Sequence, residues 1–113
     1  MEKQFRGIIL FNIELNGNLN GVYTNNLTPN AEIYTETAKL KDDTLVENGT
    51  EVHIYDSFYF DAVEGRVDCT LTFRITNGIY IAEWRLLGNE KTLFIGEGFL
   101  MNNRQIAISY WLA

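Results

Sequence analysis

Cysteine, proline and histidine are nearly absent from this sequence: each occurs once among 113 residues, as Cys69, Pro29 and His53. A single cysteine cannot form an internal disulfide, which favours a reducing compartment, so we expect a cytoplasmic protein. With one histidine and one cysteine, a zinc site or a Cys–His catalytic pair would require these two residues to meet by coincidence. We therefore expect no metal and no other cofactor.

Basic residues are also few, because nine Lys and Arg stand against fifteen Asp and Glu, for a net charge of −6. They are scattered along the chain, so they form no cluster to bind phosphate backbones or anionic lipid. No apolar run approaches the roughly eighteen residues that cross a bilayer. The start Met1-Glu2-Lys3-Gln4 lacks the layout of a signal peptide. We expect an acidic protein with neither a nucleic-acid partner nor a membrane partner.

Catalytic signatures are missing as well. Gly96-Glu97-Gly98 lacks the third glycine and the following helix of a phosphate-binding loop, and no serine lies in a nucleophile elbow. The strand register predicts that Glu83 and Glu97 face each other, which would raise the pKa of one carboxyl group. Arg85 lies diagonally to Glu97 in that register, so we interpret the three as an ion-pair cluster. We expect the protein not to be an enzyme.

Turn and strand signals are dense. The Asn-Gly pairs at 16–17, 20–21, 48–49 and 77–78 are typical of hairpin turns, in which two residues need positive φ. The runs between turn signals are rich in Ile, Val, Thr, Phe and Tyr, which favour strands. We expect strands near 4–15, 19–26, 31–40, 50–60, 66–76, 79–87, 92–101 and 104–112. Eight such strands predict an all-β protein, a single-domain up-and-down antiparallel β-barrel over residues 1–113.

One segment fits two structures. Residues 29–40 could open a helix, with Thr28 as the N-cap and Pro29 at the first helical position. The threonines and the alternation of Glu32, Tyr34 and Glu36 favour a strand instead. We expect the strand and keep the helix as the alternative.

Hairpin register predicts which side chains point into the barrel. A two-residue turn at 77–78 pairs Leu71 with Trp84 and places both inside. For the next hairpin we expect Trp84 opposite Gly96, because a slip of one residue would bury the carboxylate of Glu97. A two-residue turn at Asn102-Asn103 then predicts Phe94 opposite Trp111 and Gly96 opposite Ser109. This register encloses both indoles beside two mid-strand glycines, Gly96 and Gly98.

Two consequences follow from this register. Large aromatic side chains beside glycine and serine leave internal space for a ligand, although the glycines could instead relieve strain in a tightly coiled barrel. The outer face collects apolar residues, which are rarely exposed together on a soluble monomer and predict a homo-oligomer. The predicted interface residues are Ile81, Ile95, Phe99, Ile106, Ile108 and Tyr110.

Four short stretches are similar to the avidin and streptavidin family, small barrels of the lipocalin-like calycin group that bind biotin and form tetramers. They are residues 19–27, 82–85, 94–99 and 109–112. The resemblance implies that Asn25 hydrogen-bonds a ureido group and that Trp84, Phe94 and Trp111 form pocket walls. Tyr23 replaces the family's first-strand tryptophan, and Pro29 stands where a ligand-binding serine is expected. Residues 4–15 add a strand at the front, as a circularly permuted barrel would.

These observations predict a non-enzymatic binding protein that holds a small apolar or aromatic ligand inside a Trp-lined barrel. The alternative is a protein–protein interaction module, a regulator or inhibitor, that acts through the outer apolar face. The expected ligand-binding residues are Tyr23, Asn25, Trp84, Phe94, Ser109 and Trp111.

Overall fold

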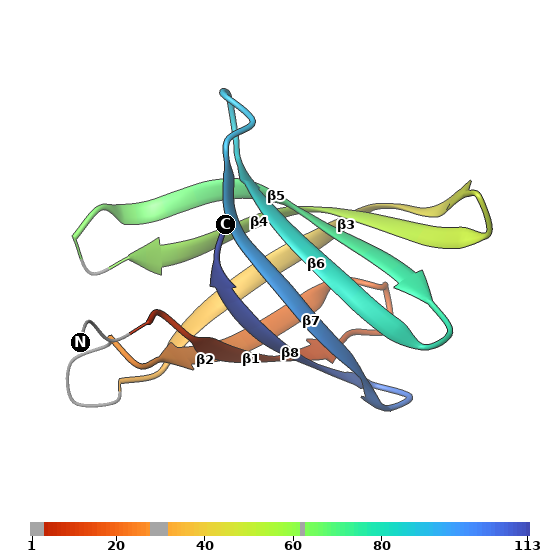
Figure 1. The fold of residues 1–113 in the computed structure, drawn as a ribbon, viewed down its shortest axis with the longest axis horizontal. Coiled ribbons are helices and arrows are strands. Elements are labelled where there is room, and N and C mark those ends of the chain that lie inside the picture. Colours follow the sequence, from red (N-terminus) through yellow and green to blue (C-terminus); the bar gives the residue numbers. More distant parts are fainter. Residues whose placement is uncertain (1–3, 28–31, 62) are drawn as a thin grey trace.

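The computed structural model describes residues 4–27, 32–61 and 63–113, which form eight antiparallel strands closed into a barrel (Figure 1). The strands are β1 (Gly7–Ile13), β2 (Leu19–Asn25), β3 (Tyr34–Glu47), β4 (Thr50–Asp61), β5 (Gly65–Thr76), β6 (Ile79–Leu86), β7 (Thr92–Asn102) and β8 (Gln105–Leu112). Each strand pairs with the next and β8 closes onto β1, which confirms the predicted up-and-down barrel. In the part of the chain that the structure describes, no helix is long and apolar enough to span a membrane.

The segment that fitted both a helix and a strand is a strand over its described part. β3 begins at Tyr34 and pairs with β2 on one side and with β4 on the other. Thr28 and Pro29, the expected helix start, lie outside the described residues. Figure 1 shows β3 and β4 as the longest hairpin, whose turn projects beyond the body of the barrel.

Three of the four Asn-Gly pairs lie at turns. Asn48-Gly49 and Asn77-Gly78 have positive φ at both residues, as a tight hairpin requires, and Gly17 has a φ of 88°. The turn expected at Asn20-Gly21 is wrong, because both residues lie inside β2. A Cβ on Gly21 would approach the Phe11 ring to 2.9 Å, so this glycine is there for close packing.

The predicted inward face is correct for both hairpins around β6, whereas the predicted register is correct only for the first of them. Leu71 pairs with Trp84, as expected. Trp84 then pairs with Phe94 and not with Gly96, a difference of two residues that leaves the same side chains inside. Trp84 is buried and Glu97 is exposed.

The predicted register of β8 is wrong. Asn102 pairs with Gln105 across a turn one residue later than expected, and the Asn102 Oδ1 accepts the Arg104 N–H at 2.8 Å. A register shift between Leu100 and Asn102 then leaves Met101 without a partner. This irregularity, one extra residue in β7, exchanges the two faces of β8.

The exchanged faces correct five residue assignments. Ile106, Ile108 and Tyr110, expected in an outer interface, are buried inside the barrel. Ser109 and Trp111, expected inside, lie on the outer face, where Arg6 stacks 5.4 Å from the Trp111 ring centre. Ile81, Ile95 and Phe99 lie on the outer face as predicted.

Side chains fill one half of the barrel. The Phe73 ring contacts Phe11 and Tyr55 at centroid distances of 5.8 and 5.5 Å, and Leu19 and Leu71 are fully buried around them. These residues form the closed end, and the aromatic edge-to-face contacts add to the area that they bury.

Gly96 and Gly98 do not leave space for a ligand. A Cβ on Gly96 would lie 2.5 Å from the Ile108 methyl and 2.9 Å from the Ser109 carbonyl, and one on Gly98 would overlap the Ala107 carbonyl. Both glycines therefore allow β8 to approach β7 closely, which favours the alternative of a tightly coiled barrel.

We expect Phe73→Ala to lower the free energy of unfolding by about 3–5 kcal/mol, because it opens a cavity in the closed end. Phe60→Ala is the matched control, since Phe60 is 47% exposed, and we expect it to cost less than about 1 kcal/mol. Urea denaturation of both variants measures the difference. Equal losses would contradict this description of the core.

Candidate ligand-binding pocket

The other half of the barrel contains a cavity of about 380 Å³ that opens at the end where β2 finishes and β3 begins. This volume lies within the range of small-molecule sites. The deep wall is buried, whereas the mouth includes the exposed residues Leu27 and Val63. The cavity is lined by Phe5, Ile9, Tyr23, Asn25, Leu27, Tyr34, Glu36, Tyr59, Phe60, Asp61, Val63, Trp84, Phe94 and Tyr110.

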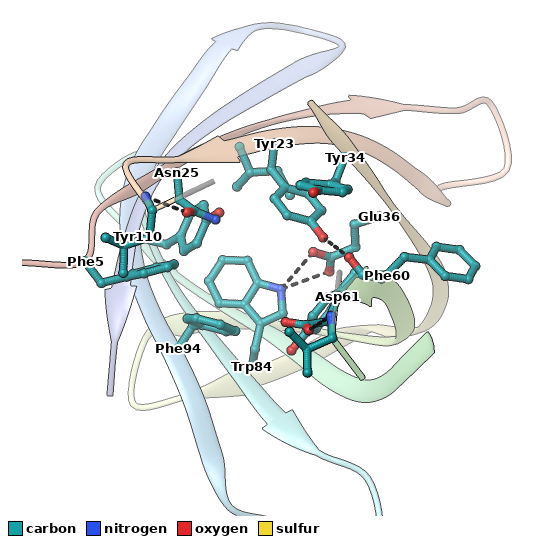
Figure 2. A pocket seen from close by; sticks show the side chains of 14 residues that line it. Phe5, Tyr23, Asn25, Tyr34, Glu36, Phe60, Asp61, Trp84, Phe94 and Tyr110 are labelled. Atoms are coloured by element: carbon teal, nitrogen blue, oxygen red, sulfur yellow. Dashed lines mark hydrogen bonds between the residues drawn. The ribbon is translucent and has the colours of Figure 1, made fainter. Parts of the chain in front are cut away.

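A buried carboxylate lies at the centre of the deep wall. Glu36 on β3 is 4% exposed, and its Oε2 accepts hydrogen bonds from the Ser57 hydroxyl at 2.6 Å and the Trp84 Nε1 at 2.9 Å. The same indole N–H lies 3.2 Å from Oε1. Figure 2 shows the indole with its nitrogen turned toward this carboxylate. The network joins β3, β4 and β6 through side chains.

Burial raises the pKa of Glu36 from 4.5 to about 7, and the hydrogen bonds from Ser57 and Trp84 oppose the rise. Removing a carboxylate from water penalises its charged form, and two donors compensate for only part of that penalty. At neutral pH the charged and the neutral form of this carboxyl group are therefore present in comparable amounts.

Aromatic rings surround the carboxylate. The Trp84 ring centre lies 5.8 Å from Tyr110 and 6.4 Å from Phe94, in tilted and edge-to-face arrangements. Tyr23 lies 6.2 Å from Tyr59 and 6.4 Å from Tyr110. These distances are typical of favourable aromatic pairs. We call the rings that line the cavity the aromatic cage: Phe5, Tyr23, Tyr34, Tyr59, Trp84, Phe94 and Tyr110, whereas Phe60 contributes its backbone carbonyl.

Three tyrosine hydroxyls of the cage are already used within the protein. The hydroxyl of Tyr23 donates to the Phe60 carbonyl at 2.8 Å and that of Tyr34 donates to Glu32 at 2.9 Å. The hydroxyl of Tyr110 donates to the Thr24 carbonyl at 3.3 Å. Burial raises the pKa of Tyr110 to about 12 and also raises the pKa of Tyr23. Both phenols stay neutral at physiological pH and hold their rings in place.

The structure brings four of the six predicted ligand-binding residues together. Tyr23, Asn25, Trp84 and Phe94 all line the cavity. Asn25 sits near the mouth, where its Oδ1 accepts the Leu27 N–H at 3.0 Å (Figure 2). Ser109 and Trp111 cannot contribute, because the register of β8 places them outside.

Sequence reasoning missed Glu36 as a site residue and assigned Tyr110 to the wrong face. A signal existed for both. Tyr34, Glu36 and Ala38 alternate along one face of β3, and a strand with alternating burial places them together. In β8 the set Ile106, Ile108 and Tyr110 is more apolar than Ala107, Ser109 and Trp111. Strand alternation taken by itself would have placed Ile106, Ile108 and Tyr110 inside the barrel.

The carboxylate pair expected on the outer face does not form. Glu83 pairs with Ile95 and makes an ion pair with Arg85, whereas Glu97 pairs with Ile81 and Ser109. Within the described residues, no group of three or more His, Cys, Asp or Glu side chains is placed to hold a metal ion. The buried carboxyl group of Glu36 is therefore the most distinctive chemical group that the described site presents.

Comparisons of the chain with protein-family models, with curated proteins and with solved structures found no match.

The raised pKa of Glu36 predicts how stability changes with pH. Because the folded state holds this proton more tightly than the unfolded state, stability falls as pH rises from about 4.5 to 7 and then levels off. The shift corresponds to a loss of about 3 kcal/mol. Glu36→Gln removes the titration, so we expect its stability relative to wild type to increase by about this amount between pH 4.5 and 8.

Urea denaturation at several pH values measures this difference. Glu97→Gln is the control, because Glu97 is an exposed carboxylate on the outer face. If Glu36→Gln and wild type kept the same difference in stability at every pH, the raised pKa of Glu36 would be refuted.

Proposed function

We propose that this protein is a non-enzymatic binding protein that holds a small organic ligand with an apolar or aromatic body in the aromatic cage. The observation that carries the proposal is an open cavity of about 380 Å³ beside a well-filled core in the same barrel. A purely apolar interior would avoid the cost of burying polar groups, whereas this barrel keeps Glu36 buried at the cavity with Ser57 buried as its hydrogen-bond donor. Small-molecule sites combine an apolar lining with few directional polar groups in the same way.

The resemblance to the avidin and streptavidin family supports this proposal only in part. Asn25, Trp84 and Phe94 line the cavity, as the resemblance implies for pocket residues. Trp111, the remaining expected wall, is on the outer face. We therefore propose, as in that family, a barrel with a ligand pocket at one end, and we do not propose biotin as the ligand.

Binding can be tested with the neutral fluorescent probe N-phenyl-1-naphthylamine, whose emission rises in an apolar site. We expect the wild-type protein to bind this probe and Ile9→Phe to bind it at least tenfold more weakly, because Ile9 lines the cavity and a larger side chain occupies it. Ile8→Phe is the matched control, since Ile8 is 64% exposed on the outer face. Equal affinity in Ile9→Phe and Ile8→Phe would contradict the proposed site.

The outer face supports a second candidate function, self-association. Five apolar residues form one continuous row across β2, β1, β8, β7 and β6, in the pairing order Val22, Leu10, Ala107, Phe99 and Ile79. Phe99 is 55% exposed and Ile79 is 44% exposed. An apolar sheet face presents the same chemistry to a second copy of the chain, so it can form a self-complementary two-fold interface.

Sedimentation velocity tests the second candidate. We expect wild type to sediment as an oligomer and Ile79→Lys to shift it toward monomer, because a lysine ammonium in the apolar row would be desolvated without a partner. Val46→Lys is the matched control, since Val46 is 66% exposed beside the turn of the β3–β4 hairpin and neither of these strands belongs to the row. A wild-type monomer would contradict self-association and would leave the row to a different protein partner.

A further inference from the structure

The cavity carries negative charge and, in its described part, no positive charge. Glu36 and Asp61 both line it, whereas no lysine, arginine or histidine is among the described lining residues. The Asp61 Oδ1 accepts the backbone N–H groups of Val63 and Glu64 at 2.7 and 3.0 Å, so this carboxylate is fixed at the mouth. An anionic ligand would meet two carboxylates in an apolar environment, which opposes its binding.

Glu36 retains hydrogen-bonding capacity toward the cavity. A carboxylate offers about four acceptor positions. Both short hydrogen bonds, from Ser57 and Trp84, end on Oε2, while Oε1 has only the longer 3.2 Å contact with the same indole N–H. Oε1 can therefore accept a further donor from a molecule in the cavity. A buried carboxylate with an incomplete set of donors is stabilised most by a donor that is also a cation.

The surrounding rings suit a cation for an independent reason. The faces of aromatic rings are electronegative and attract ammonium groups, and the attraction strengthens where water is excluded. Trp84, Tyr23 and Tyr110 are all at least nine-tenths buried, and their ring centres are within 5.8–6.4 Å of neighbouring rings. Figure 2 shows the Glu36 carboxylate between the Trp84 indole and the Tyr23 ring.

We propose that the ligand is an organic amine whose protonated primary or secondary ammonium group donates to Oε1 of Glu36 while its apolar or aromatic body occupies the cage. This inference rests on the proposed function and adds the charge of the ligand to it. The N–H donor requirement favours a primary or secondary amine over a quaternary ammonium, which has no hydrogen to donate. The net charge of −6 also attracts cations toward the protein.

Binding of an ammonium group at Glu36 depends on pH. An ammonium binds the ionised form of Glu36, and burial raises the pKa of that group to about 7. Below pH 7 the bound amine must displace a proton, so its affinity falls by up to tenfold for each pH unit. The other groups around Glu36 that titrate with a raised pKa stay neutral in this range: Tyr23, Tyr59, Cys69 and Tyr110. Asp61 is the other carboxylate that faces the cavity.

A pair of probes of equal size tests the charge of the ligand: 2-phenylethylamine, which is protonated, and 2-phenylethanol, which is neutral. Calorimetry on the full chain at pH 8 measures both affinities. We expect the amine to bind at least tenfold more tightly than the alcohol. We expect Glu36→Gln to lower the affinity for the amine at least tenfold and so to remove this preference, and Glu97→Gln to change neither affinity.

The pH series on wild type keeps the test independent of whether Glu36→Gln folds. The affinity for the amine should fall between pH 8 and pH 5.5, while that for the alcohol should not. If the alcohol binds as tightly as the amine, or if both affinities have the same pH dependence, the inference is overturned and the proposed function stands. If neither probe nor N-phenyl-1-naphthylamine binds, the inference and the proposed function both fail.

Discussion

The pocket depends on the hydrogen bonds that Ser57 and Trp84 donate to Glu36. A carboxylate at 4% exposure is costly unless donors surround it. Here the donors come from β4 and β6. The interaction therefore holds the Trp84 indole of β6 against the Glu36 carboxyl group of β3, across the barrel. Trp84 could otherwise turn its large ring into the open space. Because its N–H is held by Glu36, the ring stays at the wall and the cavity remains open.

The same barrel meets two different requirements at its two ends. At the closed end, Phe11, Phe73 and Leu71 fill the interior, and their burial provides stability. At the open end, the rings pack against one another along the wall, with hydroxyls such as that of Tyr23 held by backbone carbonyls. The wall can therefore be rigid without the centre being filled. A rigid cavity of this kind lowers the ordering cost of binding a ligand.

Much of the fold could be predicted from the sequence, because turn chemistry and strand alternation are local. Asn48-Gly49 and Asn77-Gly78 need positive φ, and the alternation along β5 and β6 places Leu71 and Trp84 inside. The face of β8 could not be predicted by counting from its turn. Register carries forward along a hairpin, so one unpaired residue, Met101, exchanges the faces of everything after it.

Part of the aromatic lining of the candidate site was predictable, and its chemistry was not. The inward orientation of Tyr23 and Phe94 follows from strand alternation alone. The role of Glu36 depends on which groups β4 and β6 bring to it across the barrel. A glutamate between Tyr34 and Ala38 looks like an ordinary strand residue in sequence. Only closure of the sheet brings a serine hydroxyl and an indole N–H to the same oxygen.

The most direct test is the NMR signal of the Trp84 indole N–H, followed as the pH is changed. The account predicts that this signal shifts with a midpoint near pH 7, because the proton is donated to the Glu36 carboxyl group, whose pKa burial raises to about 7. The Trp111 indole, on the outer face beside Arg6, should show no such transition and provides an internal reference. A Trp84 signal that stays constant between pH 5 and 9, or that shifts in step with Trp111, would contradict the account.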